Sequence, residues 1–77
     1  METLYLTKIT PIRGDDFEIR GWAPAGRVLI PSRNLLCAEE KLEMDGKVVV
    51  TLLGGRDFVV EEKIDELADC VLENVGL

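Results

Sequence analysis

The side chains that could perform chemistry are few, and their spacing forms no catalytic or metal-binding motif. Histidine is absent, so the commonest general base and metal ligand near neutral pH is missing. Cys37 has no indicated base beside it that could activate its thiol. Asp15-Asp16 could ligate a cation, but two carboxylates next to Gly14 are more typical of a tight turn. We therefore predict a protein that is not an enzyme and that has no catalytic residues, no cofactor and no metal site.

The two cysteines, Cys37 and Cys70, are isolated in apolar surroundings and lack the CxxC spacing of redox or metal sites. We predict that both are buried free thiols, with a disulfide or a reactive thiol as the alternative. The start of the chain has no basic segment followed by a long apolar one, and no apolar run reaches the length of a membrane span. These features predict a cytoplasmic protein.

Trp22 is the best candidate for contact with a protein partner. It lies in the Gly- and Pro-rich segment 21–26, with Arg20 and Arg27 close by in the sequence. A large aromatic side chain beside arginines is typical of a binding anchor. The alternative is that Trp22 closes the open end of the hydrophobic core.

Charge is distributed unevenly along the chain. The net charge is −6, and residues 61–77 contain six carboxylates and one lysine, which gives −5 for that segment and leaves −1 for the rest. An acidic helix face could meet a basic partner, although solvation alone would also explain it. The acidic total disfavours binding to phosphate backbones. The acidic candidates are Glu62, Glu66, Asp69 and Glu73, and the cations of the first half are Lys8, Arg13, Arg20, Arg27 and Arg33.

Alternation of apolar and polar residues predicts strands over 3–10, 17–20 and 27–30. Pro11 is expected to end the first strand, and segment 21–26 is expected to be a loop. Phe17 and Ile19 should point to the same side of the second strand. Segment 35–44 reads as a further strand, with a short helix over 34–42 as the alternative.

A continuous meander is predicted over 40–60. Asp45-Gly46 favours a two-residue type I′ hairpin turn, and Gly54-Gly55 a second tight turn. The strand 47–53 is so rich in β-branched residues that both its faces should be covered. Phe58 and Val60 should lie on the inner face of the last strand.

A helix is predicted from about Glu62 to Val75, because apolar residues recur there with helical period and acidic residues occupy its first turns. Gly76 is expected to end it. The apolar stripe consists of Ile64, Leu67, Ala68, Val71 and Val75. The chain is therefore predicted to be one α+β domain over 1–77. A small antiparallel sheet of about five strands, for which a partly open barrel is one form, is packed by one C-terminal helix.

Over about residues 26–71 the order of features resembles the small flagellar FlbD-like family. Val28 to Leu36 looks like the family's extended segment and following strand. Val48 to Val60 resembles the family's hairpin, which is rich in Val, Thr and Leu, and Glu62 to Leu67 is similar to the start of the family's helix. Lys63 departs from the pattern, because the family has a serine there that could cap the helix. The resemblance implies this fold and a link to motility, without implying a biochemical activity.

These observations together favour a small, non-catalytic interaction or adaptor module of bacterial or phage origin. Self-association into a homodimer is expected, because a domain of this size gains little stability from one core. A nucleic-acid-associated regulator that uses the basic first half is the first alternative. An acidic mimic that inhibits a basic protein site through the helix carboxylates is the second.

Overall fold

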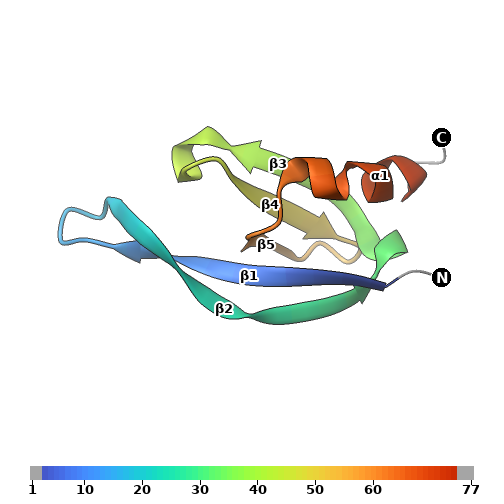
Figure 1. Ribbon diagram of the computed structural model, residues 1–77, viewed down its shortest axis with the longest axis horizontal. Helices are drawn as coiled ribbons and strands as arrows, with labels where there is room; N and C mark the ends of the chain where they lie inside the picture. The colour runs from blue at the N-terminus through green and yellow to red at the C-terminus, as the bar shows by residue number, and fades with distance from the viewer. Residues whose placement is uncertain (1–2, 75–77) are drawn as a thin grey trace.

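The computed structural model describes residues 3–74, without the side chains at 69, 70 and 72–74. Five antiparallel strands form one open sheet in the order β2-β1-β5-β4-β3, and one helix packs along β3 (Figure 1). This confirms the predicted small antiparallel sheet with a C-terminal helix, although the helix is short and the molecule is mostly sheet. The elements are β1 (Thr3–Arg13), β2 (Ile19–Pro31), η1 (Ser32–Asn34), β3 (Leu35–Lys41), η2 (Leu42–Met44), β4 (Lys47–Leu52), β5 (Asp57–Val60) and α1 (Ile64–Asn74).

β1 and β2 form a hairpin that is longer than predicted. Their pairing continues through Pro11, which lies opposite Trp22, and through the whole Gly- and Pro-rich segment 21–26. The predicted end of the first strand at Pro11 and the predicted loop are therefore wrong. β1 has a second neighbour only at Lys8, opposite Val60, so Pro11 lies where one side of the strand is open and a missing N–H is tolerated.

A β-bulge absorbs the irregular residues of this hairpin. Between the pairs Thr7↔Arg27 and Ile9↔Pro24, β2 contains one residue more than β1. Gly26 occupies this bulge with φ 107°, a backbone conformation that a residue with a side chain rarely adopts. Beyond the bulge, residues 9–24 extend away from the other strands as a two-stranded arm, seen at the left of Figure 1.

β3, β4 and β5 form the predicted meander. The predicted strand over 35–44 is confirmed as far as Lys41, and the alternative helix over 34–42 is wrong. Asp45 and Gly46 have the expected positive φ values of 59° and 73°. The predicted two-residue turn is wrong, however. The last strand pair is Lys41 with Lys47, so five residues, 42–46, connect the strands. The 3₁₀ turn η2 occupies the first three of them, and Asp45 and Gly46 follow it.

The two faces of β4 differ in burial. Val48, Val50 and Leu52 are buried, whereas Val49 and Thr51 are half-buried, so the prediction that both faces are covered is wrong. Only the inner face meets the other elements of the core. The antiparallel sheet therefore follows the common pattern of one packed and one partly solvated face.

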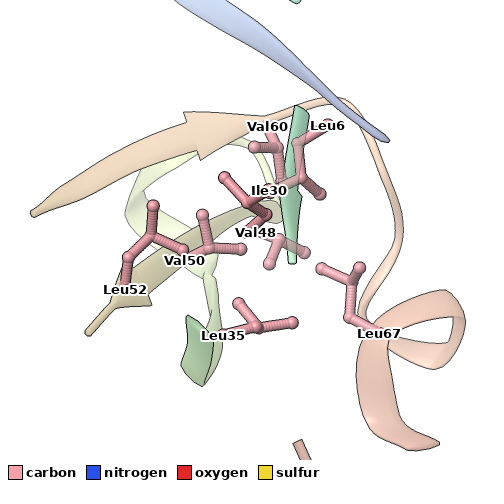
Figure 2. Packing of buried hydrophobic residues seen from close by; sticks show 8 residues of the cluster. All are labelled: Leu6, Ile30, Leu35, Val48, Val50, Leu52, Val60 and Leu67. Atoms are coloured by element: carbon pink, nitrogen blue, oxygen red, sulfur yellow. The ribbon is translucent and has the colours of Figure 1, made fainter. Parts of the chain in front are cut away.

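One hydrophobic core joins the β1–β2 hairpin to the meander and the helix (Figure 2). Figure 2 shows Leu67 reaching from α1 toward the strand side chains. The sheet stays open: across residues 3–74, β2 and β3 are its two edges, joined end to end by η1 rather than paired. The described strands therefore form an open sheet and not a closed barrel. The buried cluster consists of Leu6, Ile30, Leu35, Val48, Val50, Leu52, Val60 and Leu67.

The helix stripe is narrower than predicted. Leu67 is buried, Ile64 and Val71 are half-buried and pack against the core, and Ala68 is exposed. The placement of Ala68 on the inner face is therefore wrong, and Val75 and Gly76 lie outside the described residues. No helix within residues 3–74 is long and apolar enough to cross a membrane.

Cys37 is an exposed free thiol, so its predicted burial is wrong. A bulge between Leu35 and Cys37 changes which side chains of β3 face inward. Leu35 is buried opposite Leu52, whereas Cys37 lies opposite Thr51 on the outer face. The Cys70 side chain lies outside the described set.

Candidate protein-interaction surfaces

The tip of the arm holds an exposed aromatic residue in an unfavourable backbone conformation. The Phe17 N–H donates to the Gly14 carbonyl at 3.0 Å, and the Gly14 N–H donates to the Glu18 carbonyl at 2.9 Å. This pattern is a type I turn followed by a left-handed residue, a position that usually holds glycine. Phe17 occupies it with φ 65°, and its side chain is 79% exposed. A non-glycine residue in this region costs about 1–2 kcal/mol.

Polar contacts fix the conformation of the arm tip. The Arg13 guanidinium donates through Nη1 to the Phe17 carbonyl at 2.8 Å. Asp16 accepts the Glu18 N–H at 3.1 Å and forms an exposed ion pair with Arg20 at 2.9 Å. The turn predicted at Gly14-Asp15-Asp16 is confirmed. Phe17 belongs to this turn, so its predicted place at the start of the second strand is wrong.

A cleft of about 380 Å³ separates the arm tip from the β3–β4 connection, and we call it the arm cleft. Three of its seven lining residues are acidic and one is basic. The carboxylates of Glu18 and Glu43 have no hydrogen-bond or ion-pair partner among the described residues. The lining residues are Arg13, Phe17, Glu18, Ile19, Glu43, Met44 and Asp45.

Trp22 links the arm to the connection that forms the other wall of this cleft. Its Nε1–H donates to Asp45 Oδ2 at 3.0 Å, and the side chain is half-buried. Trp22 is part of β2 rather than of a loop, and it does not belong to the packed core cluster. The structure therefore places it outside the core cluster, where its hydrogen bond joins the arm to Asp45.

The two arginines near Trp22 in sequence take separate positions. Arg20 lies in the arm and pairs with Asp16. Arg27 lies past the bulge, opposite Thr7, with its guanidinium carbon 5.9 Å from the centre of the Tyr5 ring. Trp22, Arg20 and Arg27 are thus spread along one strand.

The cations of the first half do not gather on one free face. The Arg20 and Arg13 contacts are local to the arm tip, and Lys8 Nζ lies 5.3 Å from the centre of the Phe58 ring. Arg33 also has an interaction partner. This dispersal weakens the alternative of a nucleic-acid-associated regulator, which needs a continuous basic surface.

The acidic residues near the helix have different structural roles. Glu62 is half-buried before the helix and accepts the Thr7 N–H at 2.8 Å and the Thr7 hydroxyl at 3.0 Å. Glu66 is exposed and accepts the Lys63 N–H at 2.9 Å, which is one half of a capping box. Glu62 is therefore not part of a solvated acidic face, which weakens the alternative of an acidic mimic. The side chains of Asp69 and Glu73 lie outside the described set.

A second surface lies on the β1–β2 hairpin. Tyr5 and Leu29 are direct cross-strand partners with exposed fractions of 62% and 59%, and we call this pair the sheet patch. The Arg27 guanidinium over the Tyr5 ring adds a cation at its border. Two large apolar side chains next to each other on an exposed face can contribute to a protein interface.

Comparison of the chain with protein-family models, with curated proteins and with solved structures gives no match. The resemblance to the FlbD-like family therefore stays a prediction. Among the described residues, no group of three or more His, Cys, Asp or Glu side chains could hold a metal ion.

Proposed function

We propose that this protein is a small, non-catalytic interaction module that associates with a second copy of itself and with another protein. The observation that carries this proposal is the exposure of large apolar side chains at two separate places. Phe17 at the arm tip and both residues of the Tyr5–Leu29 sheet patch are more than half exposed, and none of them belongs to the small core.

The total surface supports the same proposal. The accessible surface is 5298 Å². A compact monomer of 8.6 kDa is expected to expose about 4,700 Å². The arm contributes to this excess, because many of its residues between 10 and 24 are exposed. Association with a partner would cover such surface and would stabilise a domain with a small core.

We assign self-association to the sheet patch. A two-fold axis brings the same patch of two copies together, so Tyr5 and Leu29 of one copy would meet those of the other. Leu29, Tyr5 and the neighbouring strand residues 27–31 include no carboxylate, and the nearest cation, Arg27, already lies over the Tyr5 ring. No buried unpaired carboxylate therefore opposes this contact.

Light scattering coupled to size-exclusion chromatography over a range of concentrations tests this assignment. We expect the wild-type mass to rise from that of one 8.6 kDa chain toward twice that value. Leu29→Glu should stay monomeric because it places a charge in the contact. The matched control is Leu53→Glu, since Leu53 is 63% exposed at the β4–β5 turn. A wild-type protein that stays monomeric at every concentration would refute self-association.

We further propose motility as the cellular setting and the cytoplasm as the location. Support for the setting is the resemblance of residues 26–71 to the FlbD-like family. Affinity capture from flagellated source cells should recover a flagellar component with the wild-type protein. Recovery of no protein partner would count against the adaptor role.

A further inference from the structure

We infer that the arm cleft binds an extended segment of another protein that carries a cationic side chain next to an apolar one. This inference rests on the proposed function, and it names the site and the chemistry of the partner. It follows from three properties of the cleft, which are the placement of Phe17, the surplus of carboxylates and the presence of apolar side chains in the lining.

The placement of Phe17 does not serve the fold of the chain. Its backbone occupies a left-handed position that glycine would fill without strain, and its ring is 79% exposed. The ring is therefore absent from the core, and the conformation disfavours the folded state. An unfavourable conformation that presents an exposed aromatic ring at the border of a cleft is typical of a binding position.

The charges in the cleft select a cation. Glu18 and Glu43 have unpaired carboxylates among the described residues, and they come from opposite walls. Asp45 adds a third carboxylate, of which one oxygen accepts the Trp22 indole N–H. The single cation of the lining, Arg13, already donates to the Phe17 carbonyl. A lysine or arginine of the partner would find carboxylate acceptors here, whereas a phosphate or an acidic peptide would be repelled.

The apolar part of the lining suits the rest of such a segment. Phe17, Ile19 and Met44 line the cleft together with the carboxylates. The hydrocarbon stem of a lysine or arginine can pack along these side chains while its head group reaches a carboxylate or the face of the Phe17 ring. Leu42 is 84% exposed on the same connection, so it can meet an adjacent apolar residue of the partner.

A second copy of this chain fits the acidic cleft less well than a basic segment of a different protein does. Because the chain has a net charge of −6, a second copy would bring like charge to the surplus carboxylates of the cleft. The cleft volume of about 380 Å³ is large enough for a few side chains of a peptide. The occupant is therefore a segment of a different protein.

The test is selection of random phage-displayed peptides on the immobilised wild-type protein, followed by affinity measurement with fluorescently labelled peptides. The selected peptides should be enriched in lysine or arginine next to aliphatic or aromatic residues. Their affinity should fall about tenfold or more in Phe17→Gly and in the double variant Glu18→Lys, Glu43→Lys. Leu53→Ser, which changes an exposed leucine at the other end of β4, should bind as the wild type does.

A stability measurement separates a binding role of Phe17 from a structural one. Phe17→Gly should retain or raise the melting temperature because it relieves the left-handed conformation, and Phe17→Asn, which also tolerates this conformation, should behave in the same way. Loss of affinity together with an unchanged or higher melting temperature supports the inference. Selected peptides that are acidic, or that bind Phe17→Gly and the double variant as tightly as the wild type, would overturn it.

The two proposals fail separately. A monomeric protein that binds cationic peptides through the arm cleft overturns self-association and leaves this inference standing. A dimer whose selected peptides show no cationic preference overturns the inference alone. Leu29→Glu should bind the selected peptides with wild-type affinity, because Leu29 does not line the cleft.

Discussion

Glu62 connects the first strand to the segment that leads into the helix. Its two carboxylate oxygens accept the backbone N–H and the hydroxyl of Thr7 at 2.8 and 3.0 Å. The adjacent Glu61 donates its N–H to the Thr7 carbonyl at 2.9 Å, while its own side chain is exposed. Two neighbouring glutamates thus differ in role. Glu62 uses its carboxylate to join β1 to the segment that leads into α1, whereas Glu61 contributes only its backbone N–H.

We expect Glu62→Ala to lower the free energy of unfolding by about 1.5–3 kcal/mol, the range for hydrogen bonds to a charged group. Glu61→Ala is the matched control and should change it by less than about 0.5 kcal/mol. Urea titration followed by circular dichroism measures both. Equal destabilisation by the two substitutions would show that the Glu62 carboxylate does not make the Thr7 contacts in solution.

The exposed thiol of Cys37 gives a second test at the scale of one residue. In the native protein Cys37 should be alkylated by N-ethylmaleimide as rapidly as in the urea-unfolded chain, because its side chain is exposed on the outer face of β3. Peptide mapping by mass spectrometry identifies the modified position. Protection of Cys37 in the native protein would mean that this face is covered, for example by a second copy.

At the scale of elements, α1 depends on its contacts with the sheet. An eleven-residue helix is marginal by itself in water. Leu67 is its only fully buried side chain among those described, and Glu66 caps its start by accepting the Lys63 N–H. Contacts with β3 and η1 provide the rest of its support. Loss of the Leu67 contact should therefore affect the whole domain.

We expect Leu67→Ala to lower the free energy of unfolding by about 2–5 kcal/mol, as for other large-to-small substitutions in cores. A small domain has roughly 3–5 kcal/mol available from one core, so much of the variant should be unfolded at room temperature. Ala68→Ser changes the next, exposed position and should stay within about 0.5 kcal/mol of the wild type. Thermal melts followed by circular dichroism compare the two. A Leu67→Ala variant as stable as the wild type would contradict the described helix packing.

At the scale of the whole molecule, the arm makes the protein elongated. The radius of gyration of the Cα atoms is 13.2 Å and the molecule measures 44 × 22 × 21 Å. A compact chain of 77 residues would have a radius of gyration near ~11.5 Å. The sheet patch and the arm cleft lie on opposite sides of the bulge in β2, so each can be occupied independently. The proposed function requires such an arrangement, because it combines binding of a second copy with binding of another protein.

The sequence by itself determined the elements whose signals are local. The β-branched run of β4, the glycine turns beside it and the helical period before Val71 placed the meander and the helix correctly, because their pairing partners are close in the chain. The positive φ of Asp45 and Gly46 was also predictable, since their residue types favour that conformation.

Only the tertiary structure decided features that depend on distant partners or on one-residue shifts in pairing. Pro11 and segment 21–26 are strand because each is held by the other across a long hairpin. The bulge beside Cys37 turned a predicted core thiol outward, since a shift of one residue exchanges the two faces of a strand. Glu62 accepts a hydrogen bond from Thr7, 55 residues earlier in the chain, and no sequence periodicity predicts this contact.

The arm cleft was beyond the sequence for the same physical reason. Its walls come from two hairpin ends that are remote in the chain, and the Trp22–Asp45 hydrogen bond links them across 23 residues. The one local signal was Gly14-Asp15-Asp16, a turn sequence that places the following residue in the position usually held by glycine. Alternation with Ile19 pointed to a strand at Phe17 instead. The hydrogen bonds that close the hairpin tip fixed Phe17 in the left-handed conformation, which presents its ring to solvent.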